Sequence, residues 1–310
     1  MAILLASHRK HFSVSSNFIA GSDDTFNLNE HQKDYFKTKE MDYKIIQPPQ
    51  QLADYVRLFW YLEYNASSDK PFIHQAFAHH CSEIVFCYKG QFKFKSAFEG
   101  EKNLSSGVYG QTQTTSKVIS DTDFGIFGFY IYPHALAQLF RMPANELTNH
   151  SIDLKTLCGK EGDILEEKIM LASDNDQRVK IVTDFLERRL KNARNEFSSI
   201  CSSIRSTSNS YEAVSVKLFA SNNFLSVRQF ERRFKEFSGF SPKQFLRIAR
   251  FNSLLNKPFQ NKRLAEIAFE YGYYDESHFS HDFKQFSGFN PKEYFKAEIL
   301  VATDRGIYSL

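Results

Sequence analysis

The 310-residue chain is long enough for two domains of ordinary size. Its composition, 42% hydrophobic and 24% charged, excludes a wholly disordered protein. The four cysteines form neither a CxxC pair nor a short-spaced framework, which excludes a zinc module and a disulfide scaffold. A net charge of +3 points to no partner until it is localised, and no apolar run reaches the length of a signal-peptide core or a membrane helix. We therefore expect a cytoplasmic protein without a membrane partner.

The first 195 residues are expected to form a tail followed by a β-rich domain. Residues 1–40 show no sustained periodicity, which is typical of a flexible tail or of a gene start assigned too far upstream. Period-two patterning begins in VRLFWYLEY, where one strand face is predicted to carry Val56, Leu58, Trp60 and Leu62. CSEIVFCY, Lys89-Gly90 and QFKFKS predict a β-hairpin, and VYGQTQTTSKVIS and FGIFGFYIY continue the strands.

This pattern predicts a small β-barrel or sandwich with flanking helices over residues 41–195, in a sensor or dimerisation domain. A helix is expected to start at Pro133, and apolar residues at helical spacing predict helices over 163–170 and 176–191. The serine-rich stretch at 196–207 predicts an interdomain linker before a domain at 208–297, with a C-terminal tail at 298–310. The expected fold class is α+β, with an all-α C-terminal domain.

Positive charge gathers in the C-terminal third of the chain. Residues 209–257 hold nine lysines and arginines against three glutamates, a net charge of six that exceeds the charge of the whole chain. Such local clustering is typical of a surface that binds a polyanion.

The same region contains an internal repeat with an offset of 49 residues. FERRFKEFSGFSPK, from Phe230, matches FSHDFKQFSGFNPK, from Phe279, at nine of 14 positions. Fixed-period similarity indicates one structural unit used twice, here a helical unit too small to fold alone.

Each copy predicts two helices joined by a tight turn. In the first, a helix at 212–220 precedes Ser226, which is expected to cap the next helix in a capping box with Gln229. In the second, Gly272 ends LAEIAFEY and Asp275 caps the following helix. Buried stripes are expected from Val227, Phe230, Phe234 and Phe237, and from Phe279, Phe283 and Phe286. These are helix-turn-helix signatures.

Residues 208–296 resemble the DNA-binding domain of the AraC/XylS transcription regulators. The run IAFEYGYYDESHFSHDFKQFSGFNPKEY carries the resemblance most specifically. The resemblance implies two helix-turn-helix units, bridged by a helix at 242–256, that enter successive major grooves about 34 Å apart. It implies a sequence-specific transcription factor, more often an activator than a repressor, controlled by an N-terminal signal-receiving domain. The expected partners are double-stranded DNA, RNA polymerase, a small-molecule effector and a second copy of the chain.

Base reading is expected mainly from the first unit. His281 stands where the family usually has arginine, and residues 258–296 hold five basic against six acidic residues. Arginine can read guanine and glutamine can read adenine by paired hydrogen bonds. Lys243 and Lys292 follow helix-starting prolines, near which a phosphate can lie. The candidate DNA-contacting residues are Arg228, Gln229, Glu231, Arg232, Arg233, Lys235, Lys243, Ser277, His278, Ser280, His281, Lys284 and Lys292.

Other readings of the chain have weaker support. His74, His79, His80 and Glu83 are metal-compatible side chains, but adjacent histidines on a strand face opposite sides, so no metal or other cofactor is expected. Cys81 and Cys87 are expected on one strand face as small buried residues rather than redox sensors. No nucleophile elbow, P-loop or HExxH helix occurs, so we expect no enzyme. A catalytic barrel with a DNA-binding tail and a non-specific architectural DNA binder remain the rival hypotheses.

Overall fold

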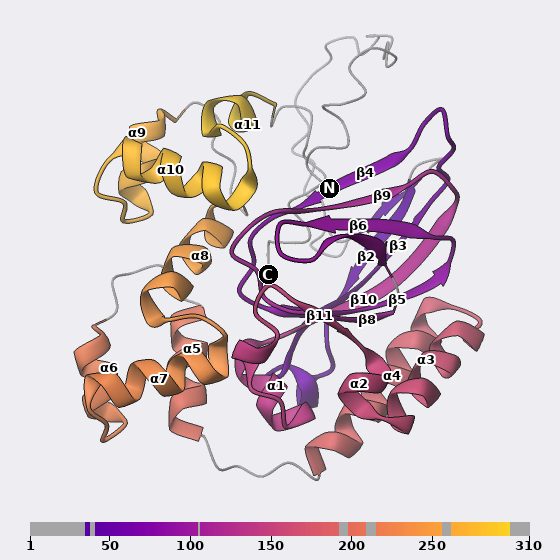
Figure 1. The fold of residues 1–310 in the computed structure, drawn as a ribbon, viewed down its shortest axis with the longest axis horizontal. Coiled ribbons are helices and arrows are strands. Elements are labelled where there is room, and N and C mark those ends of the chain that lie inside the picture. The colour runs from indigo at the N-terminus through magenta and orange to yellow at the C-terminus, as the bar shows by residue number, and fades with distance from the viewer. Residues whose placement is uncertain are drawn as a thin grey trace, which may run out of the picture.

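A computed structural model describes residues 35–37, 41–104, 106–191, 198–208, 215–255 and 262–297. Two β-sheets and their flanking helices form the N-terminal part, and helices alone form the C-terminal part (Figure 1). This arrangement confirms the predicted α+β class. Three predicted segments lie outside the described residues in whole or in part: residues 1–34, the tail at 298–310 and the start of the helix at 212–220.

The strands of the N-terminal part form two antiparallel sheets that do not close into a barrel. The seven-stranded sheet has the order β1 (Tyr35–Lys37), β2 (Met41–Ile46), β3 (Val56–Tyr64), β10 (Phe124–Ile131), β5 (Ser82–Lys89), β8 (Gly107–Tyr109) and β11 (Ser151–Asp153). The four-stranded sheet has the order β4 (Phe72–Ala76), β9 (Ser116–Ser120), β6 (Phe92–Ser96) and β7 (Gly100–Leu104). Strand β1 lies within the stretch that the sequence predicts as a flexible tail. These residues form a strand because they pair with β2.

The seven-stranded sheet has apolar side chains on both faces. One face packs against the four-stranded sheet, with Leu58 and Leu62 beside Phe72. The other face packs against the helices, and Val56 belongs to this side. The prediction that Val56 shares a face with Leu58 is wrong, because the register between β3 and β10 shifts at this end and reverses the alternation.

The predicted hairpin at 81–96 is also wrong. Strand β5 pairs with β10 and β8, whereas β6 pairs with β7 and β9 in the other sheet. Gly90 turns the chain between the two sheets with a φ of +78°, and a Cβ there would overlap the carbonyl oxygen of Asp123. The turn signal at Lys89-Gly90 is correct, but it marks a crossing between sheets.

The helices of the N-terminal part cover one face of the larger sheet (Figure 1). They are α1 (Pro133–Phe140), α2 (Leu154–Cys158), α3 (Lys160–Leu171) and α4 (Asn175–Lys191), with short 3-10 turns η2 (Gln50–Leu52) and η3 (Ala144–Glu146). The predicted helix starting at Pro133 and the two at 163–170 and 176–191 are confirmed by α1, α3 and α4. Val182, Phe185 and Leu186 of α4 are buried, as their spacing predicts.

The C-terminal part consists of α5 (Ser198–Ser208), α6 (Val216–Asn222), α7 (Val227–Ser238), α8 (Pro242–Leu254), α9 (Leu264–Glu270), α10 (Glu276–Ser287) and α11 (Pro291–Ala297). Helix α5 occupies the stretch that the sequence predicts as a linker. Ile200 and Ile204, four residues apart, are buried in the C-terminal core, and the Ser203 and Thr207 hydroxyls donate to carbonyls one turn earlier. Self-satisfied hydroxyls let a serine-rich segment remain helical.

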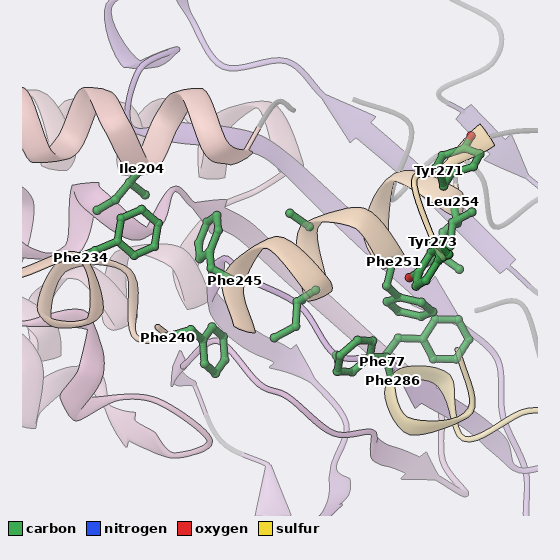
Figure 2. Close-up of a cluster of buried hydrophobic side chains, with 14 of the residues drawn as sticks. Phe77, Ile204, Phe234, Phe240, Phe245, Phe251, Leu254, Tyr271, Tyr273 and Phe286 are labelled. Atoms are coloured by element: carbon green, nitrogen blue, oxygen red, sulfur yellow. The ribbon is translucent and has the colours of Figure 1, made fainter. Parts of the chain in front are cut away.

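Aromatic rings dominate the C-terminal core (Figure 2). Phe234 meets Phe245 edge to face, with ring centroids 5.4 Å apart, and Phe251 meets Phe283 in the same way at 5.5 Å. Phe77, from the segment after β4, enters this core beside Phe251. The N-terminal part therefore contributes directly to the core of the helical part. No helix within the described ranges is both long and apolar enough to cross a bilayer.

Candidate nucleic-acid interface

Two helix-turn-helix units are present, α6–α7 and α9–α10, joined by α8 (Figure 1). The Ser226 hydroxyl accepts from the Gln229 backbone N–H, and the Gln229 side chain accepts from the Ser226 N–H, which confirms the predicted capping box. The Asp275 carboxylate accepts from the His278 N–H at 2.7 Å and caps α10 as predicted. The start and the turn of each second helix are therefore fixed by local hydrogen bonds.

Both second helices end on a glycine in the left-handed conformation. Gly239 follows α7 with a φ of +84°, and Gly288 follows α10 with a φ of +77°. Gly272 lies just beyond α9 with a φ of +69°, in the position predicted for a helix-ending glycine.

The buried stripes place the outward faces. Phe230, Phe234 and Phe237 of α7 are buried, as are Phe279, Phe283 and Phe286 of α10. Val227 was predicted in the same stripe, but it is 39% exposed. The contact between the Phe219 and Phe230 rings forms the edge of the core at this end of α7. Val227, in the first turn of the helix, lies beyond this edge and is therefore exposed to solvent.

The outward face of α7 carries the six predicted reading residues, all of them exposed: Arg228, Gln229, Glu231, Arg232, Arg233 and Lys235. Among the residues that the structure describes, none of the four cations of this set forms an ion pair. Unpaired arginine and lysine on an exposed helix are available for phosphates or for the acceptor edges of guanine. This face has the chemistry that a major groove requires.

Gln229 has a competing structural task. Its Oε1 accepts from both the backbone N–H and the hydroxyl of Ser226, each at 3.0 Å. Paired reading of adenine needs the amide oxygen as well as the amide nitrogen. The cap therefore weakens the case for adenine reading by Gln229 and leaves the arginines as the stronger candidates.

The second unit presents a different surface. Ser277, His278, His281 and Lys284 of α10 are exposed, and Ser280 is half-buried. The two imidazoles lie near one carboxylate: His278 Nε2 is 3.9 Å, and His281 Nδ1 is 3.7 Å, from the Asp282 oxygens. Because the Asp282 carboxylate lies between these side chains, this surface is expected to attract the phosphates of DNA less strongly than the cations of α7 do.

Asp282 is the residue that sequence reasoning overlooked. It is fully buried, and Arg247 of α8 holds it with two bonds, at 2.5 Å and 3.2 Å. Arg247 also donates to Gln285 and stacks on the Phe286 ring. Arg247, counted above in the basic cluster, is therefore committed to joining α8 to α10. The 49-residue offset was the available signal, because it aligns Asp282 with the exposed Arg233.

The two lysines near helix starts differ in their surroundings. Lys243 is exposed in the first turn of α8, which Ser241 caps. Lys292 is exposed in the first turn of α11, but its Nζ lies 3.8 Å from Glu276 Oε1. Lys243 is the better placed of the two for a phosphate.

The N-terminal part holds the ends of both second helices. The Thr148 hydroxyl donates to the carbonyl of Gly239 at 2.9 Å, and Gln75 Nε2 donates to the carbonyl of Ser287 at 2.6 Å. With the 49-residue offset Gly239 aligns with Gly288, so the two accepting carbonyls lie one residue apart at the same helix end of the two repeats. The positions of the two reading helices are thus tied to the β-rich part.

Helix α8 is tied to the same part. The Ala78 backbone N–H donates to Phe286 O at 2.9 Å, and its carbonyl accepts from Asn252 Nδ2 at 2.8 Å. His80 Nδ1 donates to Asn252 Oδ1 at 2.9 Å. Burial lowers the pKa of His80 to about 3, so this histidine remains neutral and acts as a structural partner.

The histidines and cysteines of the β-rich part do not form the sites considered from sequence. His79 and His80 were expected on opposite faces, but they precede β5, and their rings stack with centroids 5.1 Å apart. No cluster of three or more potential metal ligands occurs among the described residues. Cys81 is buried and precedes the strand, Cys87 is half-buried, and burial raises the pKa of both thiols, to about 11 and about 12. These thiols are therefore poor nucleophiles.

Comparison with known proteins gives two family matches. The protein-family model described as "Helix-turn-helix domain" matches residues 219–297, and the protein-family model described as "Domain of unknown function (DUF6597)" matches residues 44–153. No curated protein sequence matches the chain significantly.

Similar solved structures include two of ToxT from Vibrio cholerae. ToxT of strain O395 is 10% identical, with 84% of this chain and 98% of that chain covered and a TM-score of 0.43. ToxT of strain SCE256, bound to an unsaturated fatty acid, is 11% identical, with 83% and 95% covered and a TM-score of 0.39. An AraC-type regulator from Chromobacterium violaceum is 25% identical, with 32% and 90% covered and a TM-score of 0.28.

Proposed function

We propose, from the premise that this chain is a DNA-binding transcription regulator with an AraC-type helix-turn-helix domain, that it reads a specific operator mainly through α7. One observation carries the proposal: Arg228, Arg232, Arg233 and Lys235 are exposed on α7 and form no ion pair with any residue that the structure describes. At the matching turns of α10 stand two histidines beside a buried carboxylate. The AraC type is not an enzyme family.

The second unit has a supporting role in this proposal. It enters the adjacent major groove with Ser277, His278, His281 and Lys284, and it contributes fewer bonds than α7. Its outer surface also exposes Phe269, which is 84% accessible, beside acidic residues of α9. This surface supports RNA polymerase as a partner and activation as the direction of regulation.

Control by the N-terminal part is the third element of the proposal. The Thr148 and Gln75 side chains donate to the ends of α7 and α10, and Asn252 of α8 donates to the Ala78 carbonyl; these bonds support it. A signal that displaces the segment after β4 changes all the contacts made by that segment. The spacing of the two reading helices then changes with it, and so does the affinity for DNA.

A second copy of the chain fits the exposed face of α3. Ile164, Met170 and Leu171 of this helix are 51%, 44% and 78% exposed. A dimer would cover these side chains and double the contacted DNA. Sedimentation equilibrium at micromolar concentration checks this: a one-chain mass contradicts the dimer, and a two-chain mass that Leu171→Asp halves supports it.

Selection of bound sequences from a random DNA pool tests the reading helix. Arg232→Ala is expected to lower affinity for the selected operator by about 5- to 150-fold, the loss of one bidentate base contact of roughly 1 to 3 kcal/mol. Arg232→Lys retains the charge but loses the planar fork, so it is expected to keep the salt dependence and to relax the sequence preference at one position.

Lys180→Ala is the control, because Lys180 is exposed on α4, away from α7. It should leave the selected sequence and the affinity unchanged. A protein that binds all sequences equally, with Arg232→Ala changing only the salt slope, is instead an architectural DNA binder.

A further inference from the structure

A partly open cavity lies between the two sheets, and nothing in the DNA-reading surface uses it. Its volume is about 160 Å³, similar to the roughly 150 Å³ of an apolar cavity that holds benzene. Both sheets line it, together with Phe77 and His79 from the segment after β4. This is the segment that enters the core of the helical part.

The cavity wall contains one carboxyl group that lacks a charged partner. Glu83 of β5 faces the cavity, and its register partners are Tyr130 on β10 and Tyr109 on β8. Within the described residues Glu83 forms no ion pair. Burial raises its pKa to about 7, although hydrogen bonding from Tyr130 opposes this shift. A cation brought next to Glu83 would offset the cost of its negative charge.

The other polar groups of the cavity do not supply that cation. Burial lowers the pKa values of His74 and His79 well below the usual range, so both are neutral at neutral pH. Glu99 already accepts from Lys102 Nζ at 2.8 Å and from the Ser151 backbone N–H at 3.1 Å. No lysine or arginine occurs among the described residues that line the cavity.

The apolar walls favour the same type of ligand. Tyr109 and Tyr130 line the cavity on the strands next to Glu83, Trp60 lines it on β3, and Phe72 lines it nearer the other end of the sheet. The faces of such rings attract cations, and their edges pack against other rings. A carboxylate ligand would meet Glu83 without a positive charge among the described lining residues.

We propose that this cavity binds a small aromatic molecule that carries a protonated amine, with the ammonium group paired to Glu83. The regulatory consequence rests on the proposed function: the ligand contacts Phe77 and His79, and the same segment bonds to α8 and α10 through Ala78. The ligand therefore acts on the contacts that hold the DNA-binding helices.

Three probes of nearly equal size separate the ligand chemistries: benzylamine, benzyl alcohol and benzoate. Isothermal titration calorimetry on the full chain without DNA is expected to give benzylamine a Kd on the order of 0.1 to 1 mM, as suits a fragment of this size. Benzyl alcohol should bind about tenfold more weakly, and benzoate more weakly still. Equal affinity for the three probes, or tightest binding of benzoate, would overturn the proposal.

The pH dependence identifies the carboxyl group. Benzylamine stays protonated between about pH 5.5 and pH 8, whereas Glu83 must lose its proton to pair with it. Because the pKa of Glu83 is raised to about 7, affinity should increase roughly 30-fold over this range. The titratable groups that face the cavity with Glu83 are His74, His79, Cys81, Glu99, His150, Tyr43, Tyr109 and Tyr130. The guanidinium of Arg57 on β3 lies behind His79, with 3.2 Å between its Nη1 and His79 Nε2.

Two carboxyl-to-amide variants provide the matched comparison. Glu83→Gln should lower benzylamine affinity at about pH 8 by tenfold or more and abolish the pH dependence. Glu101→Gln, on the exposed strand β7, should change neither. His150→Gln tests the exposed histidine at the rim and should also change neither. Retention of the pH dependence in Glu83→Gln contradicts the pairing, and the wild-type probe series decides the matter if that variant does not fold.

The DNA experiment is kept separate so that the two proposals can fail independently. Benzylamine binding that depends on Glu83, with no effect on the affinity for the selected operator, supports the cavity assignment and removes ligand control from the proposed function. Operator selection without amine binding contradicts the cavity assignment alone.

Discussion

Arg247→Met is expected to lower the free energy of unfolding by about 3 to 5 kcal/mol, the usual cost of leaving a buried charge without its partner. Asp282 is fully buried, and Arg247 supplies both of its short bonds, while the Arg247 side chain is only 24% exposed. Methionine fills a similar volume without the charge. Urea unfolding followed by tryptophan fluorescence and by circular dichroism measures the change.

Two controls separate the charge from the packing. Arg247→Met combined with Asp282→Leu removes both partners, and it should recover most of the lost free energy because an apolar pair needs no compensation. Arg263→Ala breaks an ion pair with Glu266 in which Arg263 is 84% exposed, and this should cost less than about 1 kcal/mol. If the double variant is as unstable as Arg247→Met, packing rather than charge pairing is the cause.

Local rules made the helix ends predictable from sequence. The capping box of Ser226 and Gln229, the Asp275 cap and the glycines after α7 and α10 each depend on residues within a few positions of one another. The two phenylalanine stripes followed from spacing alone. The outward face of α7 could then be predicted too, because it consists of the residues that do not belong to the buried stripe.

The errors arose where distant parts of the chain decide the structure. The register shift that separates Val56 from Leu58 depends on pairing with β10, and the crossing at Gly90 depends on a second sheet. The serine-rich segment forms helix α5 because Ile200 and Ile204 pack in the same core as residues of α7 and α8. None of these partners is visible in a short window of sequence.

The candidate site shows the same division. Exposure of the α7 cations could be predicted from helical spacing, but the commitment of Gln229 Oε1 to the cap and of Arg247 to Asp282 could not be read from charge counts. The cavity around Glu83 was also beyond reach, because its walls come from strands in two sheets. Their residues are far apart in the chain.

Gly239→Ala is expected to lower the free energy of unfolding by about 3 to 4 kcal/mol and to weaken operator binding. The left-handed φ of +84° disfavours any side chain, and the added Cβ would overlap the amide of Gln111. Gln111 cannot move freely, since it is fully buried and its amide bonds to Ser82, Thr148 and the carbonyl of Ala144. Either this network or the end of α7 must shift.

A graded series of glycines tests that reasoning. Gly100→Ala shares the positive φ, at +71°, but has no atom within 4 Å of the added Cβ, so it should cost about 1 kcal/mol. Gly288→Ala, where the Cβ would lie 2.6 Å from Gln75 Nε2, should fall between the two because Gln75 is half-buried. Equal losses for Gly100→Ala and Gly239→Ala would mean that backbone strain alone acts. A larger loss at Gly239, accompanied by weaker operator binding, would mean that the contact between Gln111 and the end of α7 sets the position of the reading helix.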